Sequence, residues 1–288
     1  MSRHAFEERF FRIARRVSIA FFVGITAFPL LVMLGLSFRP VSSLLNEPGR
    51  LLPRLSEIDL GGYTRILSSR EDGGFGFGGF IGNSAYIAGV TVVLSLSFGI
   101  LAAYAATRLR YRGASFVNAS ILMVYLFPPL VFAVPLFVMF TRLGMRPSFT
   151  AVIIIYFAYT LPLALYMLRN YFSSVPADIE EAARIDGASR LGVIRHVIVP
   201  LSAPAIATVG IYVFMSAWDE FLFALLFLVE DRGSWTVALG INQLEANVGT
   251  PTTVLMAGCV VITIPVVVAF SLAQRFLTEG LTSGSVKD

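Results

Sequence analysis

The sequence predicts an all-α integral membrane protein, and three observations support that fold class. Of the 288 residues, 56% are hydrophobic and 14% are charged, and the mean hydropathy is +0.78. Soluble domains average about 25% charged residues. The apolar residues gather into windows, each near the roughly 20 residues that a bilayer-spanning helix needs. The six predicted spans are 17–38, 83–107, 116–141, 149–168, 203–229 and 253–276.

The basic residues predict how these spans are oriented. With six spans both termini share one side, and 14 of the 22 Lys and Arg residues fall on that side. Because basic residues favour the cytoplasmic ends of spans, we expect both termini to be cytoplasmic. The predicted organisation is a cytoplasmic leader (1–16), a membrane domain (17–277) and a cytoplasmic tail (278–288). This asymmetry accounts for the net charge of +4 without a nucleic-acid partner.

The spans and their connections can be interpreted in chain order. The first span has no small-residue cleavage site after it, so we expect it to remain as a helix. Residues 39–82, rich in Gly and Pro, predict an external segment with short helices at most. Asn83 and Ser84 are expected to cap the second span. Pro128, Pro129 and Pro135 predict a kinked third span, packed against neighbours that satisfy the freed carbonyls.

Two carboxylates interrupt the fifth window. Asp219 and Glu220 follow Trp218 within an otherwise apolar run. Ionisable groups at membrane depth usually face a cavity or a partner. The alternative is that the pair lies near the outer end of the helix and meets water.

The polar segment 172–200 lies between the fourth and fifth windows and has the marks of two short helices. Pro176 suits a first helical position, and acidic residues follow it at the positive end of the helix dipole. Gly187 suits the left-handed residue that ends a helix. Ser189 can cap a second helix, and Pro200 is expected to mark where the next span begins. Ala182 and Ala183 would let one face of the first helix enter a narrow groove.

This segment resembles the coupling loop of the membrane-spanning permease subunits of bacterial ATP-binding-cassette (ABC) importers. That family shares Glu-Ala-Ala, three residues, Gly, nine residues, then apolar-x-apolar-Pro. Here the pattern reads Glu181-Ala182-Ala183, Gly187, and Val197 to Pro200. The alternative is an interfacial amphipathic helix without a special role. The second span and the tail are similar to the carbohydrate-importer branch, the tail to the smaller membrane subunit of the maltose importer.

The resemblance implies a type I ABC importer permease fold of six helices with a cytoplasmic coupling helix. It implies a second homologous permease, two cytoplasmic ATPase subunits that bind ATP and Mg, an extracytoplasmic solute-binding protein and a carbohydrate substrate. The chain itself is expected to hold no cofactor or metal and to catalyse no reaction, since it lacks a phosphate-binding Gly-x-x-x-x-Gly-Lys motif.

Four groups of candidate site residues follow. The ATPase-coupling candidates are Glu180, Glu181, Ala182, Ala183, Asp186, Gly187 and Pro200. The candidates for motor contact in the tail are Gly280, Leu281 and Gly284; the alternative is a frayed terminus. The candidates for the translocation pathway are Tyr125, Trp218, Asp219 and Glu220. The candidates for contact with the binding protein are Trp235, Asn242 and Gln243.

Two other classes of protein remain open on sequence grounds. An ion-coupled secondary carrier needs coupling groups within the membrane, and Asp219 with Glu220 would have to supply them. An intramembrane enzyme needs a nucleophile with a base or a metal cluster, and neither histidine lies in a predicted span.

Overall fold

The computed structural model describes residues 3–109, 113, 120, 123 and 127–282, and every regular element within these ranges is helical. This confirms the all-α prediction. The chain divides into two compact units, one of residues 1–77 and 243–263, the other of residues 78–242 and 264–288. Each unit is described by itself.

The first unit begins with a long helix and continues through three short ones. Helix α1 (Arg3–Ser37) runs without interruption through the predicted leader and first span. Residues 39–82, predicted to be external, carry α2 (Val41–Asn46), η1 (Leu55–Glu57) and α3 (Gly61–Leu67), in agreement with the expected short helices. Arg39, buried in this segment, donates hydrogen bonds to the carbonyl oxygens of Ser43 and Glu47 and so closes the turn around α2.

The second unit is built around helices α4 (Phe77–Arg108), α7 (Phe149–Ser174) and α11 (Ala203–Trp218). The buried hydroxyls of Ser95 and Thr160 are 2.9 Å apart and join α4 to α7. A Cβ at Gly99 would lie 3.2 Å from Cδ1 of Leu168 in α7, so any larger residue there would require Leu168 to shift. Close approach at small residues is the usual way in which membrane helices pack.

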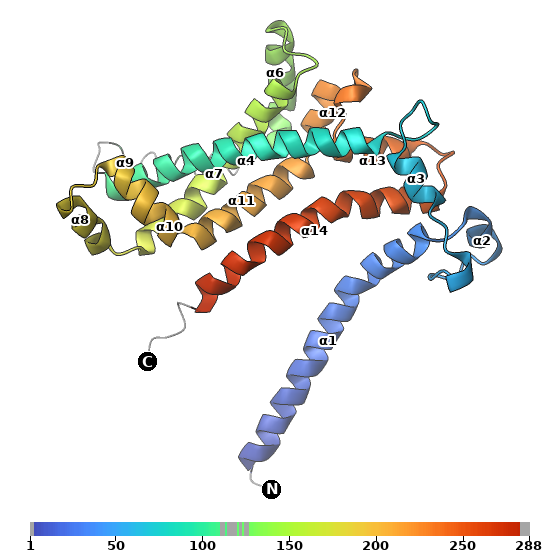
Figure 1. The fold of residues 1–288 in the computed structure, drawn as a ribbon, viewed down its shortest axis with the longest axis horizontal. Helices are drawn as coiled ribbons and strands as arrows, with labels where there is room; N and C mark the ends of the chain where they lie inside the picture. The colour runs from blue at the N-terminus through green and yellow to red at the C-terminus, as the bar shows by residue number, and fades with distance from the viewer. Residues whose placement is uncertain (1–2, 110–112, 114–119, 121–122, 124–126, 283–288) are drawn as a thin grey trace. The chain divides into compact units, whose positions relative to one another are not determined.

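Shorter helices of the second unit lie toward the two ends of α4. Figure 1 shows the segment from α8 to α10 at one end of α4 and α12 toward its other end. Their bounds, with those of the remaining elements, are α6 (Pro129–Arg142), α8 (Ala177–Ile185), α9 (Arg190–Val193), η2 (Ile194–Ile198), α10 (Val199–Leu201), α12 (Leu222–Leu228), η3 (Arg232–Ser234), α13 (Val237–Ala246) and α14 (Thr252–Thr282).

Four described helices are long and apolar enough to cross a membrane: α1, α4, α7 and α14. A fifth span is possible if the segments Arg190–Leu201 and Ala203–Trp218 are counted together, although an 82° bend separates them. Helix α6 is apolar but has only 14 residues, and the predicted third span begins outside the described residues. The count of six spans therefore stays a prediction.

The fifth window and the start of the second span differ from the prediction. The fifth window is not one helix, because α11 ends at Trp218 and α12 begins at Leu222. Helix α4 begins at Phe77, so Asn83 and Ser84 lie inside it and do not cap it. Their side chains instead bind the segment before α13: Asn83 donates to the carbonyls of Gly233 and Trp235, and Ser84 accepts from the amide of Val237.

Candidate functional site

The polar segment between α7 and α11 folds as a helix, a glycine corner and a second helix, as the sequence predicts. Pro176 flanks α8 as its N-cap residue with an extended backbone, so the helix begins one residue later than expected. Asp178 and Glu180 lie in the first turn, where negative charge complements the helix dipole. Ser189 caps α9 by accepting a hydrogen bond from the amide of Gly192.

Gly187 forms the corner with a φ of +90°, which L-residues with a side chain rarely adopt. Its amide donates to the carbonyl of Arg184, and the amide of Ala188 donates to the carbonyl of Ala183. This pair of hydrogen bonds is the Schellman motif, which satisfies carbonyls that the end of α8 would otherwise leave free. The corner fixes the angle between α8 and α9 through the backbone alone.

Beyond the corner the chain continues through a π-helical turn and then bends. Helix α9 passes into η2, whose wide turn keeps Val193 and Ile198 both fully buried. The 82° bend before α11 falls at Ser202, which is buried and outside helical geometry. Pro200 was expected to begin the next span, but it lies in α10, before the bend.

The coupling candidates separate into outward and inward residues. Glu181, Ala182, Asp186, Gly187 and Pro200 are exposed. Glu180 is only 5% exposed and is bound by Arg108 within the chain, so its side chain is not presented to a partner. Ala183 is half-buried against the hydrophobic cluster below the segment, so the groove that it fits is formed by this chain itself.

That cluster connects the segment to the long helices. It combines side chains of α4, α7, α9, η2 and α11. Its buried members are Ala103, Tyr104, Ala164, Leu168, Phe172, Val175, Val193, Ile194, Ile198, Val209 and Val213. The polar segment and three of the long helices therefore share one packed cluster.

The break between α11 and α12 surrounds the predicted pathway residues. Trp218 is 2% exposed and stacks on Phe214 with ring centroids 5.4 Å apart. The Glu220 carboxylate accepts hydrogen bonds from the Tyr156 hydroxyl at 2.5 Å and from the amides of Phe223 and Ala224. Glu220 thus caps α12 and ties it to α7.

These contacts bring Trp218 and Glu220 into the packed part of the chain, whereas Asp219 between them is exposed. Tyr125, the fourth pathway candidate, lies outside the described residues. Of the two carboxylates, Asp219 is exposed and Glu220 is half-buried.

Of the predicted contacts for a binding protein, Trp235 lies inside the molecule. It is 8% exposed, its indole N–H donates to the carbonyl of Val229, and the Arg232 guanidinium lies 4.6 Å from its ring centroid. Its ring also packs near Phe80, at 5.7 Å between centroids. Asn242 and Gln243 are half-buried on α13, so the external loop expected there contains a ten-residue helix.

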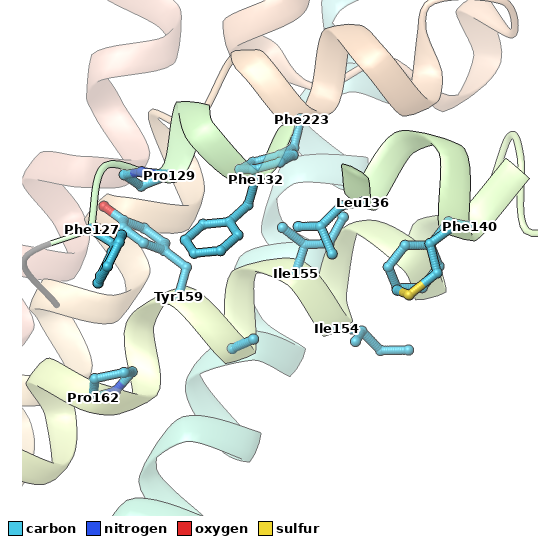
Figure 2. Close-up of a pocket in the computed structure, with 12 residues that line it drawn as sticks. Phe127, Pro129, Phe132, Leu136, Phe140, Ile154, Ile155, Tyr159, Pro162 and Phe223 are labelled. Carbon is cyan, nitrogen blue, oxygen red and sulfur yellow. The ribbon is translucent and has the colours of Figure 1, made fainter. Parts of the chain in front are cut away.

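A cavity of about 310 Å³ lies between α6, α7 and α12. Figure 2 shows the rings of Phe127, Phe132 and Tyr159 at one end and that of Phe140 at the other. Apart from the Tyr159 hydroxyl and the Met139 sulfur, the lining side chains carry only carbon and hydrogen. The cavity lacks the several hydrogen-bonding groups by which a sugar would be oriented.

In the tail, Gly280 and Leu281 belong to the last turns of α14, and Gly284 lies outside the described residues. Within the part of the chain that the structure describes, no group of three His, Cys, Asp or Glu residues is placed to hold a metal ion.

Several helices long and apolar enough to cross a membrane, joined by a capped polar loop, define the class of a multi-pass membrane protein. Comparison with known proteins gives the family. The model of the "binding-protein-dependent transport system inner membrane component" family matches residues 95–283. The chain belongs to this family, whose members are the permease subunits of ABC importers, and this sets aside the ion-coupled carrier.

The similarity to curated relatives extends over almost the whole chain. The inner membrane ABC transporter permease protein YcjP of Escherichia coli is 38% identical over 96% of this chain and 96% of its own. The trehalose/maltose transport system permease protein MalG of Thermococcus litoralis is 36% identical over 98% and 99%.

Solved structures support the fold. A bacterial ABC transporter involved in the import of the acidic polysaccharide alginate has a chain with a TM-score of 0.78 and 26% identity, covering 96% of this chain and 98% of that one. A chain of the alginate transporter in complex with a pentasaccharide-bound periplasmic protein has a TM-score of 0.67, at 16% identity.

Proposed function

We propose that the chain is the permease subunit of an ATP-driven importer for a carbohydrate: a sugar, an oligosaccharide or a related polyol or glycerol phosphate. The observation that carries this proposal is the similarity over nearly full length to permeases named for such solutes. Besides the trehalose/maltose permease, these include a trehalose permease of Mycobacterium tuberculosis and an arabinooligosaccharide permease of Halalkalibacterium halodurans, at 34% and 31% identity.

The chain is proposed to form half of the translocation pathway, with a second homologous permease supplying the other half. An extracytoplasmic solute-binding protein would deliver the solute, as the complex of the alginate transporter with its periplasmic protein suggests. The termini and the segment 172–200 would be cytoplasmic, where the exposed Glu181, Ala182 and Asp186 are available to two ATPase subunits that bind ATP and Mg.

Three candidate groups keep narrower roles in this proposal. Asp219 would face the pathway, supported by Trp218 and Glu220 behind it, and Tyr125 would lie on the same route. Asn242 and Gln243 would face the binding protein, with Trp235 shaping their loop from within. The tail, with Gly280, Leu281 and Gly284, would contact the ATPase subunits.

The test is solute uptake by the complete transporter reconstituted in vesicles with its binding protein. Trehalose, maltose, an arabinooligosaccharide and glycerol 3-phosphate are offered with MgATP inside the vesicles, and an amino acid and a dipeptide serve as controls. We expect uptake of one carbohydrate that requires both MgATP and the ATPase subunits. Uptake of the amino acid or of the dipeptide, without uptake of any carbohydrate, would contradict the proposed substrate class. Uptake without the ATPase subunits would contradict the mechanism.

A further inference from the structure

The last residue of α4 holds the beginning of α8 by two hydrogen bonds from one guanidinium group. Nε of Arg108 donates to Oε1 of Glu180 at 2.5 Å, and Nη2 donates to the carbonyl oxygen of Val175 at 2.7 Å. Val175 is the residue at which α7 ends, and Glu180 lies in the first turn of α8. Arg108 therefore binds both sides of the connection between α7 and α8.

The acceptor carboxylate is enclosed within the chain. The Glu180 side chain is 7% exposed and that of Arg108 is 18% exposed. Tyr104, one turn before Arg108 on α4, lies close to the same carboxylate. Tyr104 is itself 6% exposed and belongs to the hydrophobic cluster.

This ion pair is better suited to fixing the orientation of α8 than to stabilising the fold. Removing two charges from water costs free energy that their attraction repays only in part, so a buried ion pair is weak evidence for stabilisation. The planar guanidinium, however, directs its N–H groups at fixed angles, so a bond to a carboxylate and a bond to a carbonyl together restrict the orientation of the helix that they hold. Lysine, with one flexible ammonium group, would not impose that orientation.

Adjacent glutamates of α8 thus point to different neighbours. Glu181 is exposed on the side that the proposed function gives to the ATPase, whereas Glu180 is bound to α4. Resting on that proposed function, we propose that Arg108 and Glu180 are positioning residues that make α8 and the end of α4 move as one body. A displacement of α8 by the ATPase then reaches α4 directly through this pair, in addition to passing through α9 and α11.

The test measures the distance between α8 and α4 in the complete transporter, held in lipid nanodiscs. Spin labels are placed at exposed positions of the two helices, Asp178→Cys on α8 and Leu101→Cys on α4, with the native cysteine removed by Cys259→Ser. Distances are recorded without nucleotide and with MgATP plus orthovanadate. The variants are Glu180→Gln, the matched control Glu181→Gln on the neighbouring exposed residue, and the charge exchange Arg108→Glu with Glu180→Arg.

We expect the chain with native Arg108 and Glu180 to show one narrow distance that is the same in both states. With nucleotide trapped, Glu180→Gln should give more than one distance, and Glu181→Gln should keep the single one. The charge exchange should narrow the distances again only in part, because it restores the ion pair but not the hydrogen bond to the carbonyl oxygen of Val175. The proposal is overturned if Glu180→Gln behaves as Glu181→Gln does, or if the distance already changes with nucleotide in the native pair. It is also overturned if Glu180→Gln abolishes assembly and the exchange does not restore it, because the pair would then serve folding alone.

The amount of ATPase that co-purifies is measured in the same samples. Absence of ATPase from the complex with the native pair would contradict the proposed function. An unchanged distance in Glu180→Gln with the ATPase still bound would contradict the positioning role of the pair and leave the proposed function intact.

Discussion

Substituting Gly187 tests whether the corner between α8 and α9 sets the angle that the ATPase requires. The φ of this residue is +90°, and a Cβ added there would meet no heavy atom within 4 Å. Crowding therefore contributes nothing, and the cost of a substitution is backbone strain. For alanine in left-handed geometry that strain is about 1–2 kcal/mol. For the β-branched valine we take about 3 kcal/mol, the upper end of the range for a strained residue.

These magnitudes predict an ordered series. Each 1.4 kcal/mol changes an equilibrium constant about tenfold, so valine should lower the equilibrium constant for forming the corner about a hundredfold and alanine about tenfold. Asparagine tolerates the left-handed region and should lie closest to glycine. The assay is the amount of ATPase that co-purifies from nanodiscs, together with the rate of MgATP hydrolysis per complex. Equal behaviour of Gly187→Val and Gly187→Asn would refute the reasoning.

Two further outcomes follow from burial and from charge. Ala182→Trp, on the exposed face of α8, should reduce ATPase binding while the chain still folds. Ala183→Trp should instead overfill the chain's own hydrophobic cluster and lower the free energy of unfolding by about 1–3 kcal/mol. ATPase binding by Ala182→Trp at the native level would contradict the docking face. In the segment between α2 and α3, the hydrogen bond from Arg50 lowers the pKa of Glu57. The carboxylate therefore stabilises the fold above its ordinary pKa, and this contribution is lost as the pH falls through the lowered pKa. Thermal unfolding should show Glu57→Gln as less stable than the native chain at pH 7, and the difference should shrink as the pH falls below the ordinary pKa of a glutamate. A difference that does not change with pH would contradict this.

Local signals predicted the fold class and the shape of the polar segment. The ends of α8 and α9 depend on the conformations that Gly187 and Ser189 favour by themselves, and these conformations are readable from residue type. Which of Glu180 and Glu181 faces inward depends instead on the phase of the helix against α4, and their spacing alone does not reveal it. The same holds for Ala182 and Ala183.

The broken fifth span was missed for a different reason. Hydropathy measures composition and does not detect a break in a helix. Because apolar residues flank the break on both sides, the window 203–229 was interpreted as one continuous span. A usable signal was the position of Glu220, three residues before Phe223, whose amide it caps. Asn83 and Ser84 were misassigned because polar residues at the start of an apolar run serve equally well as caps or as anchors for a distant loop.

The π-helical turn η2 has a consequence for how this chain can tolerate changes in length. Val193 and Ile198 lie five residues apart and are both buried, a spacing that an ordinary α-helix would place on different faces. Removing one residue between them, such as the exposed His196, would leave them four apart, which is the spacing of neighbours on one α-helical face. The turn therefore accommodates one residue more than a regular helix would need, and relatives with a one-residue deletion here would keep the same side chains against the cluster.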